Sequence, residues 1–317
     1  MTTGTLRDIS ALNGRDQEVG ILDEVAGDFP EVLALPGRTI KGTTYKVTFR
    51  KNNPKGSFRA ANAGVKPGAA GYYEKLVQCS IYENPIIVDK RVAQADEDGE
   101  ADYLTNRSIE HVAGAMEGLA EQLYYGADDE ANKGFVGLKD LGTDEMRINA
   151  AGTTAAKKTT VYLVRVGVDA VHWVYGQGAG LSVPDFVEQV IADPADPTKV
   201  IPALVSPMGL WIGLASGSTR SIVKIGNITD DAGKGFTDAL VQAALELMPA
   251  GFRNNKAKLR ILANGRSVGQ LQTSRTAVNQ VAYKAGAIAD RPVESMGIQI
   301  IETDSIKIGA TEAETFA

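Results

Sequence analysis

Three side chains are the best suited in this chain to nucleophilic or acid–base chemistry: Cys79, His111 and His172. A thiolate beside an imidazole is the nucleophile of many hydrolases, and it is usually activated by a helix N-terminus or a nearby positive charge. Cys79 lies instead within the strand-like stretch YYEKLVQCSIY, and His172 lies within VDAVHWVY. We therefore expect both to be structural residues, and the sequence predicts no catalytic residue and no enzyme.

Oxygen-rich residues at 128–134 resemble the start of a calcium-binding loop. An EF-hand loop that begins at Asp128 needs glycine at its sixth position and glutamate at its twelfth, but Lys133 and Lys139 stand there. A turn after a helix that ends at Gly126 explains the segment better. With a single cysteine, the chain forms no internal disulfide and no thiolate zinc site, so we expect no metal.

Two glycine-rich segments resemble phosphate-binding loops. The segment 176–180 is spaced GxGxG, and Pro184 follows where a helix should begin. The segment 233–235 lacks a glycine five residues earlier and has Gly235 in place of the required serine or threonine. Both fail as nucleotide sites, so no cofactor is predicted.

The composition is that of a globular protein with one elaborated domain or two coupled ones. The chain has 317 residues, 44% hydrophobic and 23% charged, with a formal net charge of −6. An acidic surface argues against a protein that coats nucleic acid. Because the sequence has neither a signal-peptide pattern nor an apolar run of about 18 residues, we expect a soluble cytoplasmic product without membrane contact.

One long amphipathic helix is predicted over residues 102–126. At about 1.5 Å per residue it would be roughly 36 Å long, which suits a strut. A short apolar segment, GFVGL at 134–138, follows it. We expect the apolar stripe to pack on the subunit's own sheet. The stripe consists of Ile109, Val112, Ala113, Met116, Leu119, Ala120 and Leu123.

The sign of the charge reverses between the first 37 residues and the next 38. The first segment has two basic and seven acidic residues, and residues 38–75 have nine basic residues and one acidic residue. In the second segment, the strand-like stretches 45–50 and 72–82 flank a tip rich in glycine and proline, which predicts a long protruding hairpin. The hairpin has too little apolar surface for its own core, so it should need a partner surface.

The remaining segments mix helices and strands without a βαβ rhythm, which favours an α+β fold. Strand pairs are predicted within 159–175 and 208–228, and 176–203 reads as loop-rich. The other predicted elements are a short helix over 19–29 that Pro30 ends, a strand over 86–94, helices over 236–252 and 273–288, and strands over 258–264 and 297–306.

Taken in order, five stretches resemble the major capsid proteins of tailed bacteriophages with the Hong Kong 97-type fold. They are LPGRTIKGTTYKVTFR, FRAANAG, LAEQLYYGADDEANKGFVGLKDL, TTVYLVRVGVDAVHWVYGQGAGL and GLWIGLASGSTRSIVKIGNI. They span residues 35 to 228, and their order and spacing carry the resemblance, since none is diagnostic alone.

The resemblance implies a division of the chain into named parts. They are an acidic N-terminal arm at 1–37, an E-loop hairpin at 38–82, a peripheral domain at 83–139 with its spine helix at 102–126, a mainly axial part at 140–204, peripheral strands at 205–228, an axial part at 229–290, and a C-terminal strand and tail at 291–317.

The resemblance also implies the partners. Copies of the chain would form the pentamers and hexamers of an icosahedral shell in the virion, assembled in the host bacterial cytoplasm around DNA without sequence-specific binding. A portal protein would occupy one vertex, and a decoration protein is compatible with the family. The 37-residue arm has no room for the fused scaffolding domain of some members, so a separate scaffolding protein is expected.

The charge reversal gives these contacts a physical basis. We expect basic hairpin residues of one copy to lie against acidic surface of another copy. The basic residues of this hypothesis are Arg50, Lys51, Lys55 and Arg59, and the acidic ones are Asp16, Glu18, Asp23 and Glu24.

Two other functions are compatible with the sequence. An encapsulin, a bacterial nanocompartment of the same fold, would show an N-terminal helix that lines an inner cargo pocket and a shorter E-loop, and it would hold a cargo enzyme instead of DNA. A hydrolase with unrecognised active-site residues would be a constant monomer that turns over a substrate.

Overall fold

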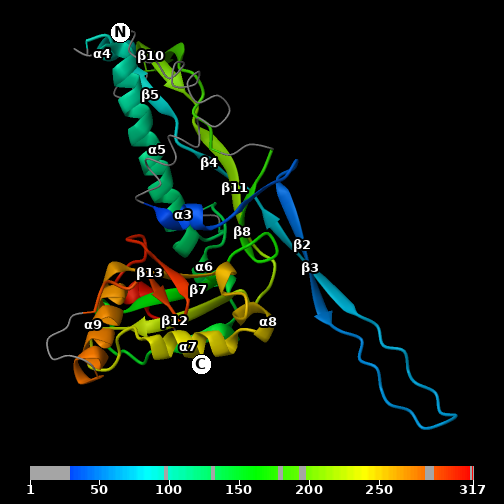
Figure 1. Ribbon diagram of the computed structural model, residues 1–317. Coiled ribbons are helices and arrows are strands. Elements are labelled where there is room, and N and C mark those ends of the chain that lie inside the picture. The colour runs from blue at the N-terminus through cyan, green and yellow to red at the C-terminus, as the bar shows by residue number, and fades with distance from the viewer. Residues whose placement is uncertain are drawn as a thin grey trace.

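The computed structural model describes residues 29–95, 99–129, 133–177, 181–192, 198–282, 289–314 and 316. It has an α+β architecture: a six-stranded sheet at one end, a long helix with two smaller sheets above it, and a hairpin that projects sideways (Figure 1).

The six-stranded sheet lies between two hydrophobic cores. Its order is β14 (Glu294–Ser295), β15 (Ile298–Glu302), β13 (Leu259–Ala263), β7 (Thr159–Arg165), β12 (Ile222–Ile228) and β6 (Arg147–Asn149). One core is shared with α7 (Asp238–Leu247) and α9 (Gly265–Ala282), near the short α8 (Ala250–Arg253). The other core is shared with the long helix. Because both faces are covered, every residue of β7 is buried, which explains its unbroken apolar run.

A four-stranded sheet connects the long helix to the hairpin. Its order is β1 (Gly37–Thr39), β8 (Val171–Tyr175), β11 (Gly209–Ser216) and β4 (Ser80–Glu83). The long helix is α5 (Glu100–Tyr125), and its buried face packs in one core with β8 and β11. The helices α3 (Pro30–Ala34) and α6 (Leu138–Leu141) close this core near the C-terminal end of α5.

A three-stranded sheet covers the N-terminal half of α5. Its order is β5 (Ile86–Asp89), β10 (Val200–Ser206) and β9 (Val187–Ala192), and the short α4 (Lys90–Ala93) follows β5. Ile86, Val88 and Leu204 form a small core with Tyr103 and Leu104 of α5. The strut is therefore held along its length by two sheets.

The helix predicted at 102–126 is present, with 26 residues, about 39 Å at 1.5 Å per residue. Val112, Met116, Leu119 and Leu123 are buried as expected, whereas Ile109 is 41% exposed. Ser108, Ala115 and Tyr124 are buried in addition. The buried stripe is therefore rotated slightly from the predicted one.

The exit from α5 is a tight turn that glycine makes possible. The Gly126 amide donates to the carbonyl of Gln122 at 2.9 Å, and the Gly137 amide donates to the carbonyl of Gly126 at 2.8 Å. A Cβ atom on Gly137 would lie 2.7 Å from the backbone of Tyr124 and Gly126, so no larger residue fits. Phe135 and Leu138 then enter the core, which makes this segment the apolar anchor that the sequence predicts.

Two predicted strand pairs are wrong in their pairing, although the strands themselves exist. The segment 159–175 contains β7 and β8, and 208–228 contains β11 and β12, but in each case the two strands lie in different sheets. β7 pairs with β12, and β8 pairs with β11. The chain thus crosses twice between the sheets, and the turns near Gly167 and Gly217 connect layers instead of closing hairpins.

Three other element predictions need correction. The loop-rich segment 176–203 contains β9 and most of β10, whose apolar and polar residues do not alternate. The last long helix begins at Gly265, eight residues before the predicted start, because the Asn264 side chain accepts a hydrogen bond from the Ser267 amide at 2.9 Å. The strand predicted over 86–94 ends at Asp89, where α4 begins. Pro30 lies in the first turn of α3, and the helix predicted over 19–29 falls outside the described residues except for Phe29.

The helix predicted at 236–252 is divided at Pro249 into α7 and α8. Thr237 occupies the N-cap position of α7 but makes no side-chain capping hydrogen bond. The predicted strands at 258–264 and 297–306 are present as β13 and β15.

The C-terminal segment ties the two large cores together. The hydroxyls of Thr303 and Ser305 donate to a carboxylate oxygen of the buried Glu31 at 2.6 and 2.7 Å. The Lys307 amide donates to the Tyr125 hydroxyl at 2.8 Å, and the Glu314 amide donates to the side chain of Asn227 at 3.2 Å. These bonds connect α3, α5 and β12 through the C-terminal segment 303–314.

The buried carboxyl of Glu312 is a weak point of this segment. Neither of its oxygens has a hydrogen-bond partner among the residues that the structure describes. Burial raises the pKa of Glu312 above 4.5 and Glu314 adds in the same direction, whereas the nearby Tyr125 side chain, Lys139 and Thr160 oppose the shift. The folded state therefore binds this proton more readily than the unfolded chain, and at neutral pH the ionised group lowers stability.

We expect Glu312→Gln to raise the free energy of unfolding at pH 7 by about 1–2 kcal/mol, because an amide removes the buried charge. The gain should shrink as the pH falls and vanish below about pH 4.5, where wild-type Glu312 is protonated in both states. Urea unfolding of the unassembled subunit at several pH values measures this. A gain that is the same at all pH values would contradict it.

Candidate inter-subunit interface

The projecting hairpin is built from β2 (Thr44–Asn52) and β3 (Gly71–Gln78). The strands are antiparallel, with Thr44 opposite Gln78 at the base and Asn52 opposite Gly71 at the far end. Phe49 and Tyr73 stack across the pair with ring centroids 4.9 Å apart, and Lys46 forms an ion pair with Glu74 at 2.5 Å. Cross-strand pairs of these kinds stabilise a two-stranded ribbon that has no core of its own.

Only the base of the hairpin rests on the body of the subunit. Val47 is buried against Cys79, Val174 and Ala215 in a small core beside the four-stranded sheet. The Arg38 guanidinium donates to the Tyr45 hydroxyl at 3.0 Å, and the Tyr45 ring meets His172 edge-on at 5.6 Å. The hairpin is thereby aimed in a fixed direction away from the sheet (Figure 1).

The predicted basic residues all lie on the exposed outer half of the hairpin. We call residues 53–70, which connect β2 to β3, the tip. Arg50 and Lys51 are in β2, and Lys55 and Arg59 are in the tip. Arg50 donates to the side chain of Asn53 at 3.1 Å, and Arg59 donates to the carbonyl of Ala63 at 2.9 Å. These local bonds hold the two guanidinium groups outward without neutralising them.

The acidic residues of the predicted contact, Asp16, Glu18, Asp23 and Glu24, lie outside the described residues. The structure therefore brings the four basic residues together on one element and leaves their acidic partners in the arm as a prediction.

Cys79 and His172 have structural surroundings. Cys79 joins β3 to β4, its Sγ lies 3.7 Å from the Val174 carbonyl, and burial raises the pKa of the thiol. Burial lowers the pKa of His172, whose Nδ1 lies 3.3 Å from the Ala170 carbonyl. A protonated thiol and a neutral, buried imidazole both lack the charge that activates a nucleophile.

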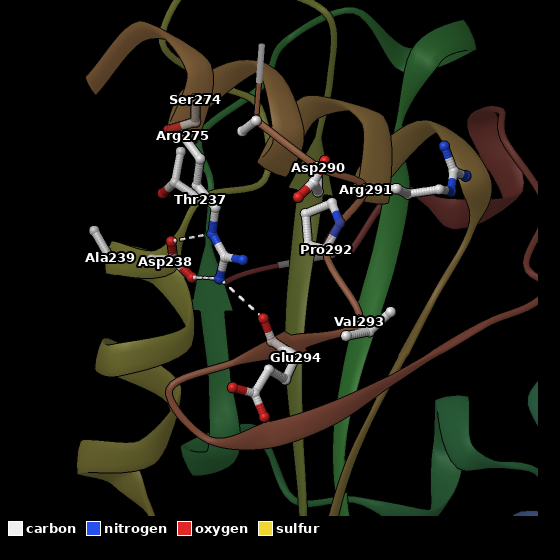
Figure 2. A pocket seen from close by; sticks show the side chains of 11 residues that line it. Thr237, Asp238, Ala239, Ser274, Arg275, Asp290, Arg291, Pro292, Val293 and Glu294 are labelled. Atoms are coloured by element: carbon white, nitrogen blue, oxygen red, sulfur yellow. Dashed lines mark hydrogen bonds and ion pairs between the residues drawn. The ribbon is translucent and has the colours of Figure 1, made fainter. Parts of the chain in front are cut away.

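The described residues form two cavities of note. One, of about 800 Å³, lies between α7, α9 and β14. Figure 2 shows its wall: the Arg275 guanidinium faces the Asp238 carboxylate, with two bonds of 2.8 and 2.7 Å, and also donates to the Glu294 carbonyl at 3.0 Å. This ion pair lowers the pKa of Asp238 and satisfies both groups, so the charges here fasten elements together.

The other cavity, also about 800 Å³, lies at the base of the hairpin. We call it the base cavity, and its lining residues are Gln78, Cys79, Ser80, Ile81, Asp128, Asp129, Lys133 and Trp211. It combines an apolar wall from Ile81 and Trp211 with two carboxylates from the α5 exit. The sequence had suggested Asp128 and Asp129 only as part of a rejected calcium loop.

Phe58 is a second feature that the sequence analysis missed. It is the sole aromatic residue of the tip 53–70, it stands next to Arg59, and its exposed fraction is 109%. The signal was available, because an aromatic residue among glycine, proline and lysine on a protruding loop has no place in a local core.

Among the described residues, no three histidine, cysteine, aspartate or glutamate side chains come together as a metal ion would require. In the same part of the chain, no helix is long and apolar enough to cross a membrane.

Comparison with known proteins identifies the family. Residues 38–315 match the family model of major capsid protein GP7. No curated protein sequence matches the chain. Among solved structures, a chain of bacteriophage Epsilon15 is 18% identical, with a TM-score of 0.67, covering 89% of this chain and 88% of that one. The bacteriophage JBD30 capsid is 11% identical, with a TM-score of 0.47, covering 87% and 93%.

The SrpI encapsulin of Synechococcus elongatus PCC 7942 is 13% identical, with a TM-score of 0.44, and the match covers 63% of this chain and 87% of that one. The Epsilon15 likeness supports the fold, and the family match, which spans most of the chain, supports the function. The chain belongs to the major capsid protein GP7 family and is a tailed-phage major capsid protein with the Hong Kong 97-type fold.

Proposed function

We propose that the shell of this capsid protein is assembled from pentamers and hexamers in which the basic hairpin of one copy lies against acidic surface of the next copy. The observation that carries the proposal is the hairpin itself. Its base is fastened to the subunit's own sheet, but its outer half extends where the described part of its own chain offers no surface to cover it. In a shell of identical subunits, the covering surface must belong to another copy.

The proposal assigns roles to the two halves of the subunit. The six-stranded sheet with α7 and α9 would be the axial domain near the capsomer centre, and α5 with the two smaller sheets would be the peripheral domain. The crossings β7–β8 and β11–β12 pass between these halves, so the sequence ranges 140–204 and 205–228 each contribute to both.

The acidic arm supplies one surface for the hairpin. Residues 1–37 have a net charge of −5 and residues 38–75 have a net charge of +8, which gives attraction between copies in register and repulsion in wrong registers. Under this proposal Arg50, Lys51, Lys55 and Arg59 contact acidic residues of a neighbour, including Asp16, Glu18, Asp23 and Glu24.

The remaining partners follow from the container function. The shell would form in the host cytoplasm on a separate scaffolding protein, would have a portal protein at one vertex, and could bind a decoration protein. It would enclose DNA without sequence-specific contacts, in keeping with its net charge of −6, and it would act as a container without catalysing a reaction.

Electron microscopy and sedimentation of the purified protein, alone and with a scaffolding protein, test the proposal. We expect closed shells with rings of five and six subunits, and nuclease-resistant DNA in particles from infected cells. Shells that hold an enzyme instead of DNA would favour an encapsulin. A monomer that never assembles and turns over a substrate would overturn the shell function.

A further inference from the structure

We propose that Phe58 at the hairpin tip of one copy inserts into the base cavity of the next copy, with Arg59 beside it paired to Asp128. This inference rests on the proposed function, because it specifies which surface of the neighbouring copy receives the tip.

The tip presents the residue types that dominate protein interfaces. Phe58 is fully exposed, and Lys55 and Arg59 flank it on the same short loop. Aromatic and arginine side chains contribute most at interface centres when they fill a pocket that excludes water. Phe58 gains nothing from its own subunit, so its apolar ring stabilises only an assembled state.

The base cavity has the complementary features. Its volume of about 800 Å³ is sufficient for an aromatic ring and an adjacent side chain. Trp211 and the 57%-exposed Ile81 supply an apolar wall, and Asp128 and Asp129 supply negative charge. Lys133 also lines the cavity, so the net lining charge is −1 against +2 for Lys55 and Arg59.

A tip cannot reach the base cavity of its own subunit. The cavity includes Gln78, which is opposite Thr44 at the base of the hairpin, and the paired strands continue to Asn52 opposite Gly71. Eight steps of about 3.3 Å place the strand ends roughly 26 Å away, and Phe58 lies farther out still. Figure 1 shows the tip far from β4 and β11, which carry Ile81 and Trp211.

The contact therefore joins two different surfaces, a tip and a base, on successive copies. Such a heterologous contact propagates in one direction and closes when the rotation between copies completes a circle. Each subunit contributes one tip and one cavity, so in a closed ring of any size every tip is bound and every cavity is occupied. The same contact would serve pentamers and hexamers, because each tip–cavity contact involves only two neighbouring copies and does not depend on the number of copies in the ring.

The first test compares Phe58→Ala with Val65→Ala, a matched truncation on the same tip. We expect Phe58→Ala to raise the protein concentration needed for shells at least tenfold, and Val65→Ala to change it less than twofold, by sedimentation. Because both residues are exposed on the tip, the melting temperature of the unassembled subunit should stay unchanged in both variants.

The second test exchanges the charges. Arg59→Asp and Asp128→Arg should each weaken assembly at least fivefold, and the double variant should recover most of the loss, because the ion pair is restored with its sign reversed. Loss in the double variant equal to the sum of the single losses would contradict the pairing of these two residues.

The third test fixes the contact covalently. In a Cys79→Ser background, Phe58→Cys with Ile81→Cys should form disulfides between copies when assembled particles are treated with copper–phenanthroline as the oxidant. We expect a ladder on a non-reducing gel that ends at five and six subunits, and no ladder from either cysteine alone. A contact with two-fold symmetry would instead stop at dimers.

The outcomes separate the two proposals. If wild-type protein forms no shells, the proposed function fails. If wild-type protein forms shells, but Phe58→Ala assembles at the wild-type concentration and the double cysteine variant gives no ladder, the tip docks elsewhere and only this inference is overturned.

Discussion

Reversing the four basic hairpin residues, Arg50, Lys51, Lys55 and Arg59, to glutamate is expected to abolish shell formation while leaving the subunit folded. All four are exposed and outside the cores, so the unassembled subunit should keep its unfolding midpoint. Each exposed ion pair contributes only about 0.2–1 kcal/mol. Replacing four such pairs per copy by repulsion weakens the free energy of contact between two copies by several kcal/mol. This loss is repeated at every copy of the shell.

The control for net charge uses two reversals on the hairpin and two elsewhere. Arg50→Glu with Lys51→Glu should prevent shells, and Arg220→Glu with Arg253→Glu, which lie at exposed positions away from the hairpin, should permit them. Sedimentation and electron microscopy give the readout at matched salt, since screening weakens all such contacts. If both pairs fail alike, net charge is responsible and the hairpin contact is rejected.

The parts of the fold that could be predicted are those in which local pattern and burial agree. α5 has one apolar stripe over seven turns, and its limits were predicted within two residues at each end. The hairpin β2–β3 alternates Tyr45, Val47 and Phe49 with polar residues, and its base packs on one side as the alternation implies. In both cases only one face of the element is buried, so the apolar residues recur with the period of a helix or a strand and can be recognised in the sequence.

Strand pairing could not be predicted because neighbours in sequence were separated in space. β7 and β12 are buried on both faces, so their residues carry no alternation that would show which sheet they join. β9 was missed because its residues VEQVIA do not alternate between apolar and polar, in keeping with a strand whose Val187 and Val190 are 54% and 69% exposed. Which strands pair is decided by packing between elements far apart in the chain.

The candidate interface was predictable in its charge and not in its shape. The switch from net −5 to net +8 marks residues 38–75 as basic, and the strand-forming stretches 45–50 and 72–82 within them predict the hairpin. The base cavity could not be anticipated, because it brings residues 78–81 together with Trp211 of β11 and Asp128 from the α5 exit. These residues are distant in sequence and meet only after the four-stranded sheet has formed around the end of α5.

Trp173 is expected to carry the largest single share of subunit stability. Trp173 is fully buried in β8, its indole N–H donates to the Val32 carbonyl at 2.9 Å, and Phe135 packs edge-on at 5.7 Å. Truncation to alanine removes this ring from the core that α3, α5 and the exit anchor share. We expect Trp173→Ala to lower the free energy of unfolding by about 3–5 kcal/mol, measured by urea denaturation of the unassembled subunit.

The chain supplies its own matched control, because its other tryptophan, Trp211, lies on the neighbouring strand β11 but borders the base cavity and is only partly buried. Trp211→Ala should cost less than about 2 kcal/mol of stability, since Trp211 is only partly buried, yet it should impair assembly if the cavity receives a neighbour's tip. Trp173→Phe keeps an aromatic ring but loses the pyrrole part of the indole and the bond to Val32, so a loss smaller than that of Trp173→Ala is expected from it. Equal losses for Trp173→Ala and Trp211→Ala would mean that the shared core does not depend on Trp173.

The two tryptophans are expected to differ because their rings lie on opposite sides of the four-stranded sheet. Trp173 faces the core around α5, so its loss should lower stability. Trp211 packs against the small core at the hairpin base, so its loss should mainly impair assembly.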